Sequence, residues 1–360
     1  MVGATAIDGG VAFEGDLPLL YKVNLSLRTA SRVIVRVAKF HADSFHELER
    51  RAKRIPWDQY LTKGSRVQFR VTCRKSRLYH SDAVAERLAE SIVKCVGEVE
   101  VANAGAKVTD DDEQRVGVDA PSQLFIVRLN HDECTISADS SGVLLHRRGY
   151  REAGGKAPLR ETLAAAMVLS SGWDQRSPLA DPLCGSGTIA IEAALIARRI
   201  PPGLWRDFAF RLWPNYRESV WTELKANVKE AFVIGPIGAL LASDRDNGVV
   251  KLAEENAARA GMLEEIQFES KPISALNLPN ESGFVVTNPP YGVRVGEGVA
   301  LRNLYAQLGN VLRKKAKGYT VVMLSADKTL ERMVAIPLTE ILRTRNGGIP
   351  VRLLKGRIDP

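Results

Sequence analysis

Apolar and polar residues follow short, regular periods along the first 140 residues. Four stretches have the apolar content or two-residue alternation of strands: residues 33–38, 67–71, 123–129 and 135–138. Two stretches have the 3.6-residue period of amphipathic helices: residues 44–54, ended by Pro56, and residues 81–96, capped by Ser81 or Asp82. This order of elements predicts a small α+β sandwich with one open sheet face.

The pattern changes near residue 158. From there onward apolar strands alternate with helices, which is typical of a doubly wound α/β sheet. A flexible break at Gly154-Gly155-Lys156 indicates a domain boundary. The predicted fold is therefore α/β, a doubly wound Rossmann-like domain preceded by an α+β region.

Composition narrows the class of protein. A chain of 360 residues with 45% hydrophobic and 26% charged residues indicates a folded protein of two or three domains. Apolar runs such as residues 189–197 are too short to cross a bilayer, and no basic segment followed by an apolar stretch begins the chain. The cysteines, at Cys73, Cys95, Cys134 and Cys184, form no CxxC pair and no cluster with the histidines. We expect a cytoplasmic protein with reduced thiols, no metal and no membrane partner.

The charge is basic and unevenly distributed. The net charge is +8 and the pI is about 9.3, which favours a polyanionic partner. Residues 50–77 hold ten Lys or Arg against the single acid Asp58, and further basic clusters occur at 147–151 and 313–317. One basic run is typical of a solvated surface, but three favour RNA or DNA. The expected RNA contacts are Arg50, Arg51, Arg54, Arg70, Arg74, Lys75, Arg77, Arg147 and Arg148.

A glycine-rich turn lies between a short strand and an Ala-rich helix, at residues 181–188. Gly185 and Gly187 allow positive φ and a close approach of the backbone to a ligand, and amides at the helix start face that ligand. The third glycine of the dinucleotide fingerprint is absent, because Ile189 and Ala190 follow, which argues against a pyrophosphate cofactor. Asp181 suits the charged amino-acid part of S-adenosylmethionine.

A second acid, Asp244, ends the next apolar strand. It can accept hydrogen bonds from both hydroxyls of a ribose, or alternatively cap the helix at 247–260. It lies 63 positions after Asp181, far beyond the roughly 20 residues of a plain βαβ unit. The excess, residues 201–236, predicts an insertion near the mouth of the site, and packing or base stacking are both open for its aromatic residues. These are Trp205, Trp213, Tyr216 and Trp221.

The tetrapeptide Asn288-Pro289-Pro290-Tyr291 follows the apolar run 284–286, at the carboxyl end of a predicted buried strand. An exocyclic base amine is a weak nucleophile, and two acceptors on its hydrogens favour the pyramidal geometry of attack. Asn288 offers its side-chain oxygen and Pro289 its carbonyl, on a turn that the prolines stiffen, and Tyr291 can stack on the base. An ordinary Asn-Pro turn is the alternative. Together with the glycine loop, the tetrapeptide predicts methyl transfer to a base nitrogen, and the base has to be flipped or unpaired.

These residues resemble THUMP-domain class I RNA methyltransferases of the RlmL type over nearly the whole chain. The similarity rests on motifs that follow in the family's order; they are residues 145–151, 158–161, 181–188, 201–204, 243–244 and 288–292. The resemblance implies N2-methylation of guanosine in 23S ribosomal RNA with S-adenosylmethionine as cofactor.

The resemblance also implies a domain organisation and a set of site residues. A ferredoxin-like module would span residues 1–60, a THUMP RNA-binding domain 61–150 and an S-adenosylmethionine-dependent methyltransferase domain 151–360. The implied catalytic residues are Asn288, Pro289, Pro290 and Tyr291. The implied cofactor-binding residues are Pro158, Asp181, Leu183, Cys184, Gly185, Ser186, Gly187, Thr188, Asp244, Arg245, Ser274 and Asn288.

The chain departs from the family pattern in three places. It begins inside the second strand of the N-terminal module, so we expect an opening strand and helix to be absent. Pro272 stands where relatives place an acid for the adenine amino group, with Ser274 nearby. The chain ends after one methyltransferase domain, so we expect no second activity.

Four alternative functions stay open. The substrate can be transfer RNA, because relatives in the family that methylate transfer RNA share these motifs. The target can be adenine N6, because the tetrapeptide recognises an amine and not a particular base. A non-catalytic RNA-binding protein suits the basic N-terminal half but does not need Asn288. A nicotinamide dehydrogenase shares the sheet but is disfavoured by the missing third glycine.

Overall fold

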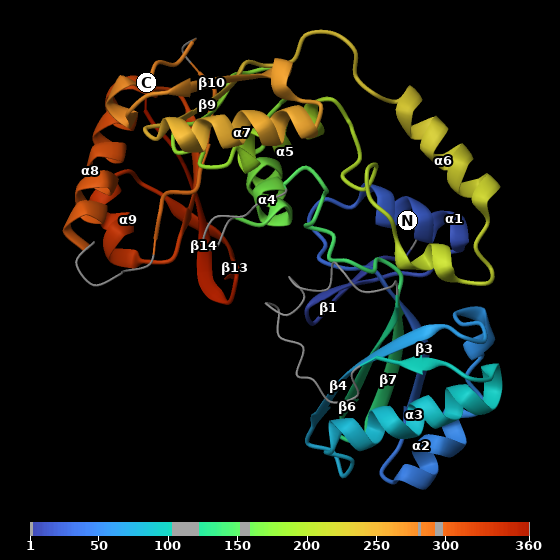
Figure 1. The fold of residues 1–360 in the computed structure, drawn as a ribbon. Coiled ribbons are helices and arrows are strands. Elements are labelled where there is room, and N and C mark those ends of the chain that lie inside the picture. Colours follow the sequence, from blue (N-terminus) through green and yellow to red (C-terminus); the bar gives the residue numbers. More distant parts are fainter. Residues whose placement is uncertain (1–2, 103–121, 152–158, 280–281, 292–297, 360) are drawn as a thin grey trace. The chain divides into compact units, whose positions relative to one another are not determined.

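The computed structural model describes residues 3–102, 122–151, 159–279, 282–291 and 298–359. The chain divides into two compact units (Figure 1). Unit 1 comprises Met1–Leu145 and Gly203–Asn227, and unit 2 comprises His146–Pro202 and Val228–Pro360.

Unit 1 begins with a hairpin and a helix that the sequence pattern did not predict. Strands β1 (Thr5–Ile7) and β2 (Gly10–Ala12) pair in an antiparallel register. Helix α1 (Leu17–Ser26) starts at Asp16, whose side chain accepts a hydrogen bond from the backbone N–H of Leu19 at 3.0 Å. That bond satisfies one of the free amides at the helix start.

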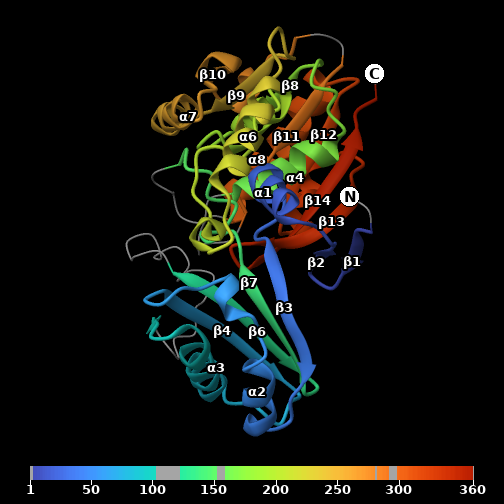
Figure 2. The same ribbon diagram turned by 90° about the vertical axis from the view of Figure 1, so that its right-hand side faces the viewer.

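The main sheet of unit 1 has the order β3-β7-β6-β4-β5 within the described residues. Its strands are β3 (Ile34–His41), β4 (Arg66–Arg74), β5 (Glu100–Val101), β6 (Gln123–Asn130) and β7 (Glu133–Asp139). Helices α2 (Phe45–Ala52) and α3 (Ser81–Val96) and the short 3-10 helix η1 (Trp57–Gln59) complete it. Figure 2 shows α2 and α3 on one side of this sheet, so the predicted α+β sandwich is confirmed.

Residues 203–227 of the aromatic insertion belong to unit 1, and the rest of the insertion belongs to unit 2. Trp213 and Trp221 are buried. The ring of Tyr21 in α1 stacks on Phe210 at 4.6 Å between centroids and meets Trp221 edge-on. The indole N–H of Trp213 donates to Gln123 Oε1 at 2.7 Å. These rings therefore serve packing, whereas Trp205 is 48% exposed. The insertion also carries the 3-10 helix η3 (Ala209–Leu212) and helix α6 (Glu218–Glu230).

Unit 2 contains the doubly wound sheet that the sequence predicts, in the order β10-β9-β8-β11-β12-β14-β13 within the described residues. The first five strands in this order are parallel; they are β10 (Ile266–Ser270), β9 (Leu240–Asp244), β8 (Leu179–Asp181), β11 (Phe284–Thr287) and β12 (Thr320–Ser325). A C-terminal hairpin of β13 (Thr339–Asn346) and β14 (Ile349–Arg357) adds antiparallel strands at the β12 edge. The sheet is therefore mixed.

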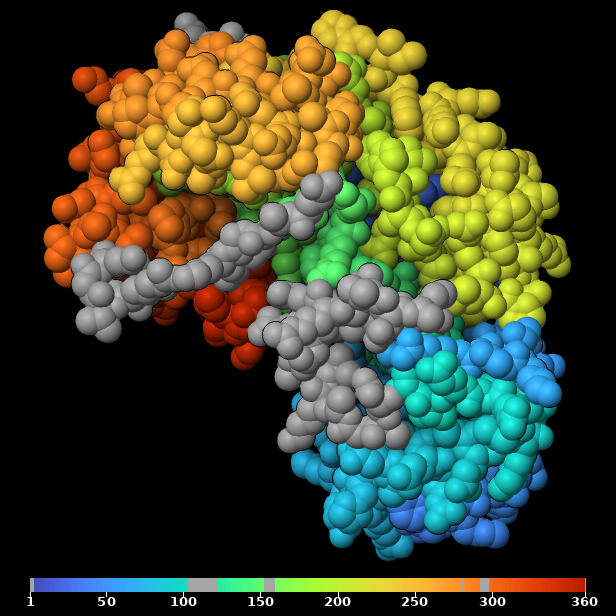
Figure 3. Space-filling model, viewed as in Figure 1, coloured from blue at the N-terminus to red at the C-terminus, as the bar shows by residue number. Residues whose placement is uncertain are grey.

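Helices cover both faces of this sheet. Helices α4 (Glu161–Ser171), α5 (Thr188–Ala197) and α7 (Asn247–Arg259) pack against one another in that order, and α7 presents its outer side to the surface (Figure 3). On the other face, Tyr305 and Leu308 of α8 (Gly298–Lys315) and Leu330 of α9 (Lys328–Val334) join a core with β11 and β12. Short 3-10 helices η4 (Leu263–Glu265) and η5 (Ile273–Ala275) flank β10.

Three further properties concern the chemistry that the chain can support. Among the described residues, no group of three or more His, Cys, Asp or Glu is arranged to hold a metal ion. None of the described helices combines the length and the apolar character that a membrane span needs. The cysteines Cys73, Cys95, Cys134 and Cys184 are free thiols.

Candidate active site

Two loops leave the same edge of the unit 2 sheet, as the sequence predicts. Strands β8 and β11 are parallel neighbours, with Leu179 opposite Phe284. Thr287, the last residue of β11, donates its hydroxyl to Asp181 Oδ1 at 2.9 Å, and both side chains are buried. Because strand order reverses between β8 and β11, this is the switch point at which open α/β sheets bind ligands.

The glycine loop uses its two glycines differently. Gly187 has φ +80°, and an added Cβ there would lie 2.9 Å from Cβ of Ala253 in α7. Gly185 has φ +51°, and an added Cβ there would meet no heavy atom of the described residues within 4 Å. Gly187 therefore permits the loop to pack against α7, whereas Gly185 keeps an open space beside its backbone. Helix α5 follows directly, with the N–H of Ile191 bonded to the carbonyl of Gly187.

The two candidate acids both hold the glycine loop. Asp181 accepts the backbone N–H of Leu183 at 3.3 Å as well as the Thr287 hydroxyl. Asp244 Oδ2 accepts the N–H of Gly185 at 3.2 Å. Burial raises the pKa of Asp181 to about 7, and the nearby charge of Asp244 raises it too, against the two hydrogen bonds, which lower it. Burial likewise raises the pKa of Cys184, so its thiol stays protonated at neutral pH.

Helix α7 braces the loop through Asn256, which the sequence analysis missed. Asn256 is fully buried and donates to the carbonyl of Ser186 at 3.0 Å. Arg259 in turn donates to Asn256 Oδ1 at 2.7 Å and to the carbonyl of Tyr150 at 2.9 Å. The available signal was a polar residue on the helix face that also carries the buried Ala253.

The segment before α4 also reaches the loop. Arg151 donates to the hydroxyl of Thr188 and to the carbonyl of Leu159. Its guanidinium lies 3.6 Å from the buried Glu161 carboxylate. Pro158, another expected cofactor contact, lies outside the described residues.

Arg148 corrects the expected set of RNA contacts. Its side chain is in the interior, with Nε 3.4 Å from Oε1 of the equally buried Glu192. The hydroxyl of Tyr150 donates to the same oxygen at 3.2 Å. A guanidinium neutralised inside the protein cannot reach a phosphate, so the basic cluster at 147–151 is partly structural.

The remaining expected RNA residues lie at or near the surface. Arg54, Arg74 and Lys75 are exposed, and Arg51, Arg70 and Arg147 are partly buried. The exposed Arg50 pairs with Glu47 at 2.7 Å, and the exposed Arg77 pairs with Asp43 at 3.0 Å. Most of this cluster therefore presents cationic groups to solvent within unit 1.

The tetrapeptide after β11 contains an unsatisfied acceptor. Asn288 Oδ1 is shielded from solvent and has no hydrogen-bond partner among the described residues. The carbonyl of Pro290 accepts the Tyr305 hydroxyl at 3.2 Å, and the Tyr291 hydroxyl accepts from Asn346 Nδ2 at 2.9 Å. Pro289 is buried. An orphaned buried amide oxygen is costly unless a ligand satisfies it, so this loop is suited to binding a hydrogen-bond donor.

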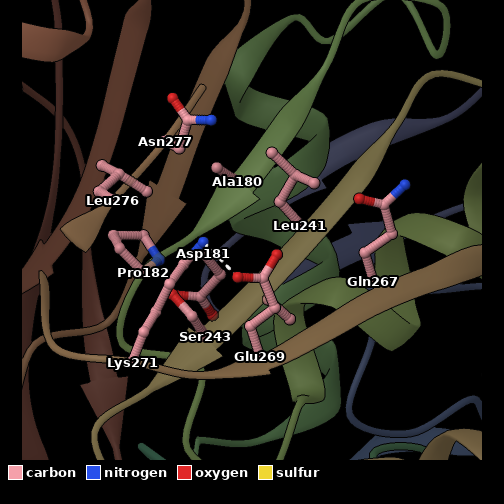
Figure 4. A pocket seen from close by; sticks show the side chains of 11 residues that line it. Ala180, Asp181, Pro182, Leu241, Ser243, Gln267, Glu269, Lys271, Leu276 and Asn277 are labelled. Carbon is pink, nitrogen blue, oxygen red and sulfur yellow. Dashed lines mark hydrogen bonds and ion pairs between the residues drawn. The ribbon is translucent and has the colours of Figure 1, made fainter. Parts of the chain in front are cut away.

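A hollow lies beside the first loop, along the carboxyl halves of β8, β9 and β10 (Figure 4). Asp181 and Ser243 line one side, and Glu269 and Lys271, which form an ion pair at 2.7 Å, line another. Of the other expected cofactor residues, Arg245 and Ser274 are exposed and Leu183 is partly buried. The hollow includes none of these three.

Comparison with known proteins identifies the three parts of the chain. Residues 148–355 match the family described as "RMKL-like, methyltransferase domain", residues 3–34 the RlmL ferredoxin-like domain and residues 42–139 the THUMP domain. The THUMP match thus begins before residue 61, the boundary that the sequence analysis expected.

Several relatives align with almost the whole chain. Slr0064 of Synechocystis, provisionally named an RNA methyltransferase, is 35% identical over 96% of this chain and 88% of its own. The ribosomal RNA large subunit methyltransferase K/L of Syntrophotalea carbinolica is 34% identical over 96% of this chain. This chain spans about half of the length of that relative, 48%.

Solved structures agree with the fold. SMU.472, provisionally named a methyltransferase and complexed with SAH, has a TM-score of 0.84 at 28% identity, covering 99% of this chain and 92% of its own. A Listeria monocytogenes protein named as a predicted N6-adenine-specific DNA methylase has a TM-score of 0.83 at 31% identity, covering 99% and 90%. With the family match extending over more than half of its residues, this chain belongs to the RMKL-like methyltransferases, with an RlmL ferredoxin-like domain and a THUMP domain before the methyltransferase domain.

Proposed function

We propose that this protein transfers a methyl group from S-adenosylmethionine to the exocyclic N2 of a guanine in RNA, with 23S ribosomal RNA as the substrate. The observation that carries the proposal is the buried Oδ1 of Asn288, which no described residue satisfies, beside the strand that ends at Asp181. The family supplies the reaction class. The names of the K/L relatives support a large-subunit ribosomal RNA.

The residues of the glycine loop suit the methyl donor. S-adenosylmethionine, when bound, supplies an electrophilic methyl group on its sulfonium. Asp181 would hold the ammonium group of the donor and Asp244 the ribose hydroxyls. The open space at Gly185 lets the backbone approach the cofactor closely. The SAH complex of SMU.472 supports this choice of donor.

The tetrapeptide would orient the base. In this proposal Asn288 Oδ1 and the carbonyl of Pro289 each accept one hydrogen of the target amine, because the carbonyl of Pro290 is already engaged by Tyr305. That arrangement favours a pyramidal nitrogen whose lone pair faces the methyl group. The proton is lost after attack, so no strongly basic side chain is needed. Tyr291 would stack on the base.

Unit 1 would bind the RNA. Its THUMP match carries the exposed Arg54, Arg74 and Lys75. Cations that neutralise phosphates give affinity that falls steeply with salt and carries no sequence information. Selection of the nucleotide then depends on which base can reach Asn288 unpaired or flipped.

Adenine N6 is the second candidate target. The name of the similar Listeria monocytogenes protein, a predicted N6-adenine-specific DNA methylase, favours it. An Asn-Pro-Pro-Tyr loop would contact an exocyclic amine, which both bases possess. The two targets differ in the product nucleoside, which makes them separable by one measurement.

The decisive experiment incubates the protein with isotopically labelled S-adenosylmethionine and total RNA from a strain that lacks its gene. Ribosomal and transfer RNA are then separated, digested to nucleosides and analysed by mass spectrometry. We expect labelled N2-methylguanosine from 23S ribosomal RNA. N6-methyladenosine as the sole product would refute the guanine assignment, label in transfer RNA alone would refute the ribosomal one, and no label in any RNA would refute both.

A further inference from the structure

The C-terminal hairpin delivers one buried side chain to the tetrapeptide. Strands β13 and β14 are joined by Gly347 and Gly348, whose φ angles of +53° and +84° match a two-residue type I′ turn. The register pairs Asn346 with Ile349 across that turn. The hairpin register therefore fixes the backbone position of Asn346 at the end of β13.

Asn346 is 4% exposed although it adjoins an exposed turn. Its Nδ2 donates to the hydroxyl of Tyr291 at 2.9 Å, 55 positions away in the sequence. Its Oδ1 is buried and has no hydrogen-bond partner in the part of the chain that the structure describes. A buried amide whose oxygen is unsatisfied is unfavourable, and among the described residues the bond to Tyr291 is the side-chain hydrogen bond that offsets part of this cost.

We infer that Asn346 is a positioning residue that fixes the ring of Tyr291 for stacking on the target base, an inference that rests on the proposed function. The ring is anchored at its backbone end, because the preceding carbonyl of Pro290 accepts the Tyr305 hydroxyl. Asn346 anchors the opposite end at the hydroxyl. A ring held at both ends loses little rotational freedom when a base stacks on it, so more of the stacking energy is available to orient the amine at Asn288.

A double-mutant cycle tests this role. Asn346→Ala and Tyr291→Phe each remove the same hydrogen bond while keeping an aromatic ring at position 291. We expect each variant to lower kcat/KM for RNA about 10-fold, and the double variant to lose no more than either one. Cofactor affinity, measured by calorimetry, should not change. Thr344→Ala, on the same strand and two residues away, should retain wild-type activity.

Independent losses would contradict the inference. If the double variant loses the product of the two single effects, Asn346 acts by a route other than Tyr291. If the Thr344→Ala control loses as much kcat/KM as Asn346→Ala, the loss reflects general damage to the hairpin.

A second measurement does not depend on which molecule is methylated. With 3-fluorotyrosine placed at position 291, the fluorine resonance should shift in Asn346→Ala and stay unchanged in Thr344→Ala. An unshifted resonance in Asn346→Ala overturns the inference even when the enzyme is active. If the resonance shifts in Asn346→Ala but the wild-type enzyme labels no RNA, the contact between Asn346 and Tyr291 stands and the proposed function is refuted.

Discussion

The loop after β8 and the loop after β11 leave neighbouring strands of one sheet, yet they hold their shapes by different means. The glycine loop is held mainly through its backbone: Asp244 accepts from Gly185, and Asn256 donates to Ser186. The tetrapeptide is stiffened by its own prolines and by Tyr305, and it leaves Asn288 Oδ1 unsatisfied. The glycine loop thus leaves open space beside its backbone for an extended ligand, whereas the tetrapeptide leaves one side-chain oxygen available to a small hydrogen-bond donor.

The largest effect should come from the tetrapeptide. Asn288→Ala removes the unsatisfied oxygen, and we expect kcat to fall about 10²- to 10³-fold, the range for loss of one preorganised polar group in an active site. Binding of RNA and of cofactor, measured separately, should persist. The matched control is Asn310→Ala, at an exposed position of α8. Turnover that survives in Asn288→Ala would remove the assigned role.

The glycine loop should respond through folding and cofactor affinity instead. Gly187→Ala places a Cβ 2.9 Å from Ala253 at φ +80°, so we expect the free energy of unfolding to fall by about 2 kcal/mol or more. Gly185→Ala meets no atom of the described residues within 4 Å at φ +51° and should cost about 1 kcal/mol, but its methyl group would enter the space proposed for the cofactor. Calorimetric titration should show at least a roughly 10-fold weaker donor affinity for Gly185→Ala.

Equal unfolding costs in the two glycine variants would contradict this distinction. So would unchanged donor affinity in Gly185→Ala, because the open space beside that residue would then have no ligand.

The sequence predicted the elements whose signals are local. Apolar strands followed by Asp181 and by Asn288 placed both loops at one sheet edge, because parallel strands in a doubly wound sheet end together, and the pairing of β8 with β11 confirms it. The glycines at 185 and 187 were identifiable because only glycine adopts their positive φ freely. The roles of these residues toward ligands stay predictions.

The long-range partners could not be predicted in the same way. Nothing in the sequence near Asn346 or Tyr305 indicates a contact with residues 290–291. The hairpin that carries Asn346 did have a local signal that was overlooked, namely Gly347-Gly348 between two strand-like stretches. Arg148 shared a basic cluster with Arg147, and charge alone does not distinguish a solvated guanidinium from one paired with Glu192. The stacking of Phe210 in the insertion on Tyr21 could not be predicted either, because Tyr21 lies far back in the chain.

Asp181, which hydrogen-bonds to both Leu183 and Thr287, gives a pH test of the comparison between the two loops. With a folded pKa of about 7 against 3.8 for the free side chain, Asp181 stays protonated in the folded protein while the unfolded chain ionises. Without cofactor, the free energy of unfolding should therefore fall as pH rises from about 4 to about 7, by roughly 1 to 4 kcal/mol, and level off above that. Urea unfolding of Asp181→Asn should lack this slope.

Asp174 supplies the matched control. Desolvation raises its pKa, but backbone hydrogen bonds from Ser177 and Arg176 lower it by more. Asp174→Asn should therefore remove a stabilisation that is present above the unfolded pKa and lost as pH falls.

The affinity of the wild-type protein for the methyl donor should rise through pH 7, because the ionised Asp181 attracts an ammonium group. Affinity independent of pH across this range would argue against a direct contact between Asp181 and the cofactor.

The smallest expected effect concerns the hydrogen bond that joins the two loops. Thr287→Val keeps the shape of the buried side chain but removes the donor to Asp181 Oδ1 at 2.9 Å, and we expect a loss of about 1 kcal/mol. Because that bond lowers the pKa of Asp181, its removal should raise the pKa further and weaken donor binding at neutral pH. Since Thr287 also precedes Asn288, kcat should fall with donor affinity, each by a few fold.

Thr320→Val in the neighbouring β12 is the control and should change neither donor affinity nor kcat. If Thr287→Val weakens donor binding but leaves kcat unaltered, the two loops work independently.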